Sequence, residues 1–174
     1  MHMRLHLLTL LLAVATVCAD AAPEARPLIV GMELAYPPFE MTDEKGKPTG
    51  VSVDLANALG AHLNRPVEIQ NLPFDGLIPS LKTGRIHLII SSMTANPERA
   101  KAIDFSDPYL STGLCLLVPK NSAIQSIADA DQKKRVIAVK QGTTGHLFSR
   151  SLKNATVLVL DRESAACLRW RREK

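Results

Sequence analysis

Two short, unbroken apolar runs limit the fold of this chain more than any other feature. Leu28–Met32 and residues 88–90 lack polar alternation, which is typical of strands buried on both faces of a parallel sheet. Two parallel strands that are neighbours in a sheet must be joined by a long crossover connection, which usually contains a helix. The chain must therefore alternate strands with helices, and we predict an α/β fold.

The segments around these runs carry the expected helix and strand signals. Val67–Asn71 predicts another strand, and residues 76–82 predict a short helix that stops at Gly84. Asp54 opens a longer helix whose apolar residues recur every fourth position and are expected to face the core. These apolar residues are Leu55, Leu59 and Leu63.

A second series of elements follows residue 113. We predict strands at residues 114–118, 136–139 and Thr156–Leu160, and a helix near residues 146–152. A Gly-containing turn precedes that helix; it is either a tight turn or an anion site built from backbone N–H groups. The chain length allows the two series to form one ordinary domain or two small lobes.

The N-terminal residues have the pattern of a secretory signal peptide. Arg4 precedes an apolar run at residues 7–17, and small residues follow before Asp20. The run is too short to span a bilayer, and a buried N-terminal helix is the alternative. We therefore expect residues 1–19 to be removed and the protein to be exported.

Charge and residue types exclude several function classes. The formal net charge is +4, yet residues 20–168 carry 16 basic and 16 acidic side chains, so nucleic-acid binding is not expected. The His residues are scattered and no Cys pair has zinc-ligand spacing, so we expect no metal and no cofactor. Cys115 and Cys167 are expected to be buried thiols, with a disulfide as the alternative.

Residues 91–99 are the most informative segment. They directly follow a buried strand, where open α/β sheets bind ligands. Asn96 and Pro97 suit the N-cap and first position of a helix, which places Arg99 where a cation opposes the helix dipole. A cation in the first turn of a helix is unfavourable, and a need to bind a carboxylate would explain its presence, because a guanidinium binds a carboxylate bidentately. The alternative is a solvated surface arginine.

Other candidate residues lie in loops after predicted strands. Tyr36 and Phe74 are placed to sandwich a ligand side chain, or else to fill gaps in the core. Glu33 faces the same cleft or is a surface carboxylate. The sequence has no nucleophile elbow, zinc-protease motif or phosphate-binding loop, so we do not expect an enzyme.

Five segments, in this order, resemble the bacterial extracellular solute-binding proteins of family 3, the polar amino-acid receptors of ABC importers. They are "IVGMELAYPPFEM", "GVSVDLANALGAHL", "PFDGLIPSLKTG", "LIISSMTANPERAKAIDFSDPYLSTG" and "VIAVKQGTTG". The resemblance implies the two-lobed type II periplasmic-binding-protein fold, a free amino acid and a membrane permease as partners, and a periplasmic monomer.

The resemblance also implies a domain organisation. Lobe 1 would cover residues 20–113 and lobe 2 residues 114–168, with residues 169–174 an aberrant basic tail. Family members continue for roughly another third beyond residue 166, so we expect the second lobe and its closing elements to be incomplete, as in a truncated product.

By the same resemblance, four residues would bind the ligand's backbone groups. Arg99 would hold the α-carboxylate, with Thr94 donating its N–H to it and Thr144 contacting it from the second lobe. The Ser92 carbonyl and the Thr94 hydroxyl would bind the α-ammonium.

Three further residues would surround the ligand's side chain. Tyr36 and Phe74 would flank it, and Glu33 would lie near its tip. A carboxylate there favours a polar or basic side chain, such as that of arginine, lysine, histidine or glutamine, over an acidic one.

Three alternatives keep the lobes but change the function. A cyclohexadienyl or arogenate dehydratase would need an acid or base beside the ligand, for which Glu33 is the candidate. A membrane sensor would need a transmembrane segment after the lobes. An inert fragment would bind nothing.

Overall fold

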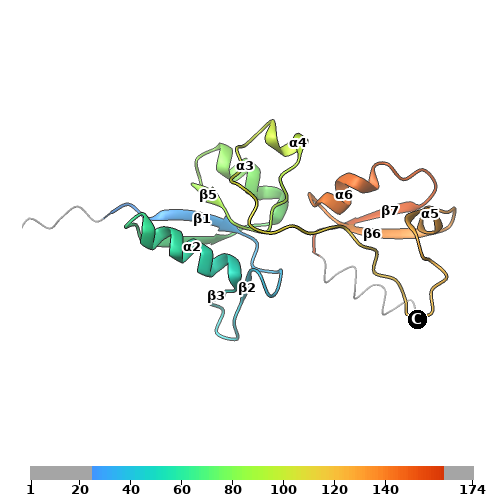
Figure 1. Ribbon diagram of the computed structural model, residues 1–174, viewed down its shortest axis with the longest axis horizontal. Coiled ribbons are helices and arrows are strands. Elements are labelled where there is room, and N and C mark those ends of the chain that lie inside the picture. The colour runs from blue at the N-terminus through green and yellow to red at the C-terminus, as the bar shows by residue number, and fades with distance from the viewer. Residues whose placement is uncertain (1–24, 163–174) are drawn as a thin grey trace, which may run out of the picture.

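The computed structural model describes residues 25–162, which form two lobes side by side (Figure 1). The expected signal peptide and basic tail lie outside the described residues. Within residues 25–162, no helix is long and apolar enough to cross a membrane.

Lobe 1 is built on the parallel sheet that the apolar runs predicted. β1 (Leu28–Met32) is the central strand, and β4 (Val67–Asn71) and β5 (Leu88–Ile89) pair with it on either side, both parallel. The shorter elements of this lobe are β2 (Met41–Thr42), β3 (Pro48–Thr49), the 3₁₀ turn η1 (Phe74–Gly76) and α4 (Pro97–Ala100).

Two helices cover opposite faces of this sheet. Leu28, Val30 and Met32 point to α2 (Val51–His62), where they pack with Val53 and Ala56. The alternate residues face α3 (Leu77–Lys82), whose Leu77 is fully buried against Ile86. A Cβ on Gly31 would collide with the end of the Ile86 side chain, so any larger residue there would force Ile86 to shift.

The buried face of α2 differs from the predicted one. The helix begins at Val51, and Leu55 and Leu63 are exposed, while Leu59 only borders the core. The helix lies so close to the sheet that small residues occupy the contact. A Cβ on Gly60 would collide with the Val67 side chain. The buried residues of α2 are Ser52, Val53, Ala56 and Gly60.

The described part of lobe 2 contains one pair of parallel strands, β6 (Val136–Lys140) and β7 (Thr156–Leu160), which confirms both predicted strands. Its helices are α5 (Ile127–Ala130) and α6 (Thr144–Ser149). The helix expected near residues 146–152 starts earlier because the Thr143 hydroxyl caps it, accepting a hydrogen bond from the His146 N–H at 3.3 Å.

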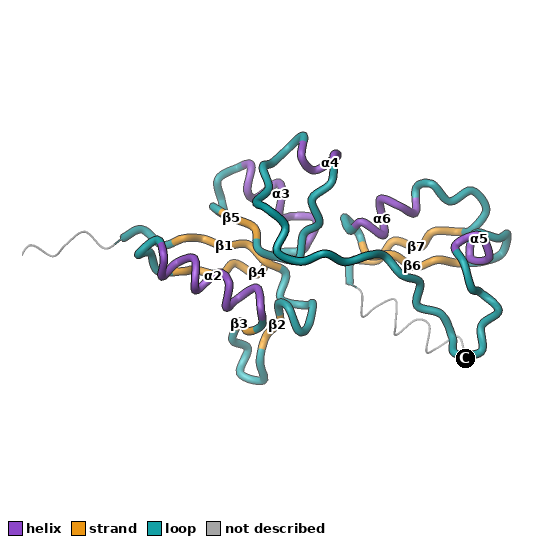
Figure 2. Tube along the Cα trace, in the orientation of Figure 1, coloured by secondary structure: helices purple, strands orange, loops and turns teal. Residues whose placement is uncertain are grey.

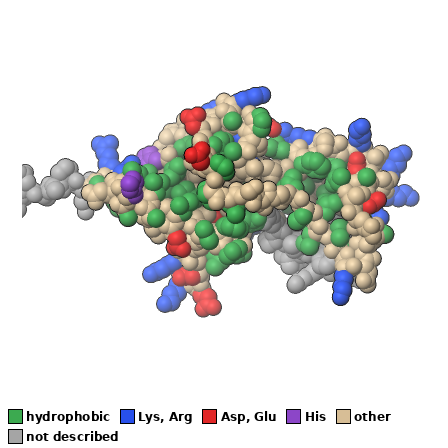
Figure 3. Space-filling model, viewed as in Figure 1, with side chains coloured by type: hydrophobic (Ala, Val, Ile, Leu, Met, Phe, Trp, Pro, Cys, Tyr) green, Lys and Arg blue, Asp and Glu red, His purple; other side chains and the backbone are tan. Residues whose placement is uncertain are grey.

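The segment between the lobes is not the strand predicted at residues 114–118. It runs as a long irregular connection (Figure 2) and pairs with no strand among residues 25–162, so no ladder can form. Cys115 lies exposed on it, so the expectation that this thiol is buried is wrong; Cys167 lies outside the described residues. Leu114 and Leu117 are also exposed, and Figure 3 shows hydrophobic side chains over both adjoining lobes.

Candidate ligand-binding site

The two lobes meet where strands of both sheets end. Glu33 follows β1, and Ser92 and Thr94 follow β5 in lobe 1. Lys140 ends β6 in lobe 2, and the turn after it leads into α6. Parallel sheets bind ligands at the carboxyl ends of their strands, so this junction is the candidate site.

Arg99 is buried at the junction and links both lobes. The Asn96 side chain caps α4 by accepting a hydrogen bond from the Arg99 N–H at 2.9 Å, as the sequence predicted. The Arg99 guanidinium donates to the Thr94 carbonyl at 2.6 Å and to the Gly142 carbonyl of lobe 2 at 2.8 Å. Its Cζ lies 5.4 Å from the centroid of the Phe74 ring.

The electrostatics of Arg99 are unusual for a surface arginine. The residue is only 6% exposed, so the alternative of a solvated side chain is wrong. Burial lowers the pKa of Arg99, and the negative charge of Glu98 opposes this shift to a lesser extent. Within residues 25–162 no carboxylate forms a salt bridge with it. The site therefore holds a buried cation that forms no ion pair within the described residues.

Glu33 is also buried, and its partner comes from the other lobe. Its carboxylate forms an ion pair with the Lys140 ammonium, 107 residues away in sequence. The Glu33 N–H donates to the Ser91 hydroxyl at 3.0 Å, which fixes the loop after β1. Lys140 Nζ lies 5.6 Å from the Phe74 ring centroid. Glu33 is therefore not a free surface carboxylate.

Sequence reasoning missed Lys140. The signal that identifies it is a lysine directly after the apolar residues 136–139, at the ligand-binding end of a buried strand.

Further contacts close the junction around this pair. Gln141 donates to the Asp75 carboxylate at 2.8 Å. Gly142 packs against the same residue, because a Cβ there would lie 3.0 Å from the Asp75 Cβ, and its φ of +74° also favours glycine. At the rim, Arg150 and Glu98 form an exposed salt bridge of 3.6 Å. These contacts tie the turn after β6 to lobe 1.

Ser92 is hydrogen-bonded to Glu40, a buried acid that the sequence analysis also missed. The residue has a φ of 50°, and its hydroxyl donates to Glu40 Oε2 at 3.0 Å. The Ser52 hydroxyl donates to the same oxygen at 2.6 Å. Burial raises the pKa of Glu40, although these hydrogen bonds oppose the shift. The loop that carries Ser92 is thus fixed in a backbone conformation that few residues adopt.

The two predicted aromatic residues lie in different surroundings. Phe74 is half-buried beside the Arg99 and Lys140 cations. Tyr36 is exposed and stacks on Phe39, with ring centroids 5.7 Å apart. Thr144 is half-buried as the first residue of α6.

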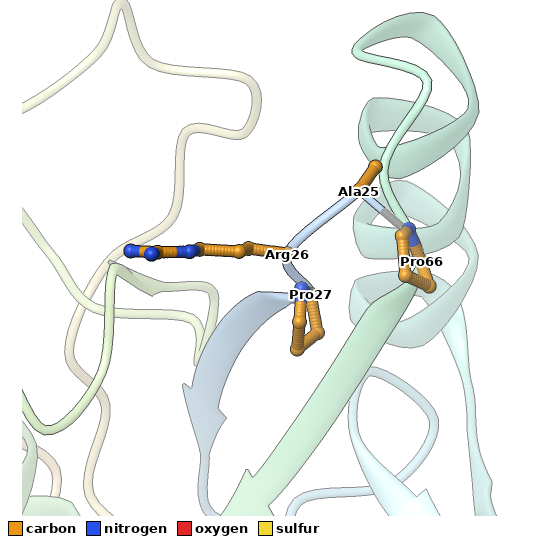
Figure 4. A pocket seen from close by; sticks show the side chains of 4 residues that line it. All are labelled: Ala25, Arg26, Pro27 and Pro66. Atoms are coloured by element: carbon orange, nitrogen blue, oxygen red, sulfur yellow. The ribbon is translucent and has the colours of Figure 1, made fainter. Parts of the chain in front are cut away.

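Two hollows in the surface differ in what lines them. A cavity of about 260 Å³ lies between the lobes, and Phe74 and Arg99 are the predicted site residues that line it, together with Gly142 and Leu147 of lobe 2. The other predicted residues are not among its lining residues: Glu33, Tyr36, Ser92, Thr94 and Thr144. A larger hollow of about 480 Å³ lies at the opposite, amino-terminal edge of the sheet (Figure 4). Its lining is Ala25, Arg26, Pro27 and Pro66. Arg26 is the one charged residue in this lining, and its side chain points away from Pro66. The hollow therefore has no converging polar groups that could orient a ligand, and the interlobe cavity is the better candidate site.

Two α/β lobes that meet around buried charges define a two-lobed binding protein. The chain belongs to the bacterial extracellular solute-binding proteins, family 3, whose sequence profile matches residues 28–168. The resemblance noted in the sequence is thereby confirmed.

Known proteins agree with this assignment. The chain is 38% identical over 157 residues to the arginine-binding periplasmic protein of Mannheimia haemolytica, covering 89% of this chain and 60% of the relative. An ancestral arginine-binding protein solved with arginine superposes with a TM-score of 0.80 at 35% identity, over 86% of this chain and 67% of that one.

A third relative bears on the question of catalysis. It is an ancestral amino acid-binding protein described as a precursor of cyclohexadienyl dehydratase, with a TM-score of 0.78 at 37% identity. The alignment covers 82% of this chain and 64% of that one. These named relatives are binding proteins.

The chain spans about half the length of the curated relatives it matches.

Proposed function

We propose that this chain is the substrate-binding component of an amino-acid ABC transporter and captures a polar or basic amino acid between its two lobes. The observation that carries the proposal is Arg99, a buried guanidinium that bridges the lobes and has no carboxylate partner among residues 25–162. The arginine-binding and amino acid-binding names of its relatives support the class of ligand.

The ligand's α-carboxylate would provide the counter-charge that Arg99 lacks. A buried cation is costly without a partner, and a charge-assisted pair with a carboxylate offsets that cost. In this arrangement Arg99 exchanges its hydrogen bond to the Gly142 carbonyl for the ligand. The Thr94 N–H and Thr144 would complete the carboxylate site from lobe 1 and lobe 2.

The remaining predicted residues would hold the other groups of the amino acid. The Ser92 carbonyl and the Thr94 hydroxyl would accept hydrogen bonds from the α-ammonium and so orient it. Phe74 would contact the side chain, with Tyr36 at the open edge of the site and Glu33 near the side-chain tip. The position of Phe74 beside the two cations supports this part of the proposal.

Transport requires no chemical step, only different affinities of the open and closed lobes for the ligand. A membrane permease would then accept the closed, loaded form. We propose that the protein works as a monomer in the periplasm, after export by the signal peptide at residues 1–19. The periplasmic location named for a relative supports this placement.

A thermal-shift screen of the full chain against the twenty amino acids tests the proposal. Ligands that bind the native state raise the unfolding temperature by mass action. We expect a polar or basic amino acid to give the largest rise. The absence of a rise with every amino acid, in a chain that unfolds cooperatively, would contradict the proposal.

A dehydratase related in fold is the enzymatic alternative. It would require Glu33 to exchange protons with the ligand, yet the Lys140 ammonium already engages that carboxylate. We therefore expect no turnover of prephenate or arogenate by the full chain, measured by absorbance. Turnover that Glu33→Gln abolishes would establish the enzymatic function instead.

A further inference from the structure

Within the described residues, Arg99 is hydrogen-bonded to lobe 2 through one backbone carbonyl. Each terminal nitrogen of its guanidinium donates to a carbonyl, one to Thr94 of lobe 1 at 2.6 Å and the other to Gly142 of lobe 2 at 2.8 Å. Arg99 and Gly142 both line the interlobe cavity. A carbonyl is a neutral acceptor, whereas a carboxylate forms a stronger, charge-assisted bond with a guanidinium. The Gly142 carbonyl therefore occupies a position on Arg99 that a ligand carboxylate can take over.

The N–H of the same glycine is bonded to His146. It donates to His146 Nδ1 at 3.2 Å. The N–H groups of Gln141 and Thr143, on either side of Gly142, donate to backbone carbonyls instead. Gly142 is thus the residue of this turn whose N–H depends on a side chain.

His146 is itself held in a defined position near the start of α6. Its N–H donates to the Thr143 hydroxyl at 3.3 Å, and this hydroxyl donates to the Lys140 carbonyl at 2.8 Å, where β6 ends. A neutral imidazole has one donor and one acceptor nitrogen, and Nδ1 is the acceptor here. The residue is half-buried. The helix cap therefore places the acceptor that the Gly142 N–H uses.

We propose that His146 is a positioning residue: by accepting the Gly142 N–H, it keeps the Gly142 carbonyl on Arg99 as an internal competitor for the ligand's α-carboxylate. The inference rests on the proposed function, in which Arg99 binds that carboxylate. Gly142 has a φ of +74°, in a region that glycine adopts readily and other residues rarely do. Because glycine has the largest conformational freedom, its carbonyl needs a restraint to keep one direction.

This competition sets the affinity of the site. An incoming carboxylate must displace the braced carbonyl, so part of its binding free energy only replaces a bond that Arg99 already has. Without the imidazole acceptor, the Gly142 N–H must turn to water, and the turn loses the restraint that directs its carbonyl. Arg99 then has a weaker partner before the ligand binds, and the same ligand gains more by pairing with it. The effect corresponds to one hydrogen bond, a change in affinity of about two- to tenfold.

Two substitutions at His146 separate the acceptor from the rest of the side chain. His146→Phe keeps an aromatic ring but has no acceptor, so its affinity for the ligand should rise about two- to tenfold. His146→Asn retains an acceptor, because Oδ1 of asparagine is as many bonds from the backbone as Nδ1 of histidine, so it should restore the parent's affinity. A residue that only stabilises α6 would lower the affinity in both variants or leave it unchanged.

The first measurement is calorimetric titration of the full chain. L-arginine is the first probe, because relatives of this chain are arginine-binding proteins, and L-glutamine, L-lysine and L-histidine follow if the parent does not bind it. His62→Phe is the matched control, since His62 is an exposed histidine of lobe 1, and it should bind like the parent. Melting curves establish that each variant folds. If His146→Phe does not fold, His146→Leu replaces it, because leucine also lacks an acceptor.

The second measurement observes the brace itself. Hydrogen exchange of the Gly142 N–H, followed by NMR without an added amino acid, should be faster in His146→Phe than in the parent. His146→Asn should exchange at the parent's rate, because its amide oxygen replaces the imidazole acceptor.

The outcomes separate this inference from the proposed function. Tighter binding by His146→Phe, together with faster Gly142 exchange that His146→Asn reverses, supports the inference. Equal or weaker binding by His146→Phe, or the same Gly142 exchange in all three proteins, overturns it while the proposed function stands. A folded parent that binds none of the twenty amino acids overturns both.

Discussion

Lobe 1 contains a hydrophobic core, whereas the described part of lobe 2 contains almost none. The three strands of lobe 1 are covered by helices on both faces; β1 and both helices contain buried residues, and β4 and β5 add partly buried ones. In lobe 2, Ala130 is the one buried apolar residue of the described part, and Val136 and Val159 of its two strands are exposed. A two-stranded sheet is marginally stable by itself.

The difference indicates that the described part of lobe 2 is held in place largely by its contacts with lobe 1. The polar contacts gather around the turn after β6 and the helix that follows it. They comprise the Lys140–Glu33 ion pair, the Arg99 bond to Gly142, the Gln141 bond to Asp75 and, at the rim, the Arg150–Glu98 salt bridge. The candidate site and the attachment of lobe 2 therefore share most of their interactions.

Core truncation gives the largest expected contrast between the lobes. Leu77→Ala in lobe 1 removes a fully buried side chain and should lower the unfolding free energy by about 2–5 kcal/mol. Val159→Ala in lobe 2, where the side chain is 40% exposed, should cost less than about 1 kcal/mol. Urea denaturation of both variants measures the difference. Equal costs would show that lobe 2 has a core of its own.

A methyl group at the junction tests the attachment of lobe 2. Gly142→Ala places a non-glycine residue in the left-handed region, which costs about 1–2 kcal/mol, and presses it against Asp75. Gly46→Ala is the matched control, with a φ of +76° and open space around it. Only Gly142→Ala should also increase the radius of gyration in small-angle scattering. The same radius in both variants would argue against a closed junction.

The buried acid of lobe 1 predicts stability that falls with rising pH. Burial raises the pKa of Glu40 above its ordinary value of 4.5, so the folded chain holds this proton more tightly than the unfolded chain. Its contribution is full below pH 4.5 and is lost as the pH rises through the raised pKa. Glu40→Gln should flatten this decline in denaturation experiments, and the exposed Glu44→Gln should not. A decline unchanged in Glu40→Gln would exclude this group as the source.

An acid of lobe 2 predicts a smaller effect of opposite sign. Asp131 accepts hydrogen bonds from the N–H groups of Lys153, Asn154 and Ala155 at 2.8–2.9 Å, which lowers its pKa below 3.8. The stabilisation is present above pH 3.8 and is lost as the pH falls through the lowered pKa. Asp131→Asn should therefore be less stable than the parent at neutral pH but not at the acid end.

Hydrogen exchange before β7 measures the effect of Asp131→Asn locally, with the exposed Asp104→Asn as control. Protection of residues 153–155 that is identical in the Asp131 and Asp104 variants at neutral pH would contradict the assignment.

Patterns within one element predicted the fold of lobe 1 well. The apolar runs gave β1 and β5, and the Asn96–Pro97 pair gave the start of α4 and hence the position of Arg99. The face of α2 was mispredicted because hydrophobic periodicity assumes that large residues mark the contact. The close packing of Gly60 on Val67 reverses this rule.

Contacts between lobes could not be predicted in the same way. The pairing of Lys140 with Glu33 depends on the relative placement of two sheets, which no local pattern encodes. The strand expected at residues 114–118 failed for a related reason, because a strand depends on its neighbour as well as on its own residues.

Titration calorimetry of Arg99 variants tests the central claim most directly, with the amino acid that best stabilises the parent as the ligand. Arg99→Ala should lose about 2–5 kcal/mol of binding free energy, more than tenfold in affinity. Arg99→Lys should recover only part of it, because a point charge cannot reproduce the guanidinium fork. The exposed Arg85→Ala should bind like the parent. Binding by Arg99→Ala as tight as that of the parent would contradict the account.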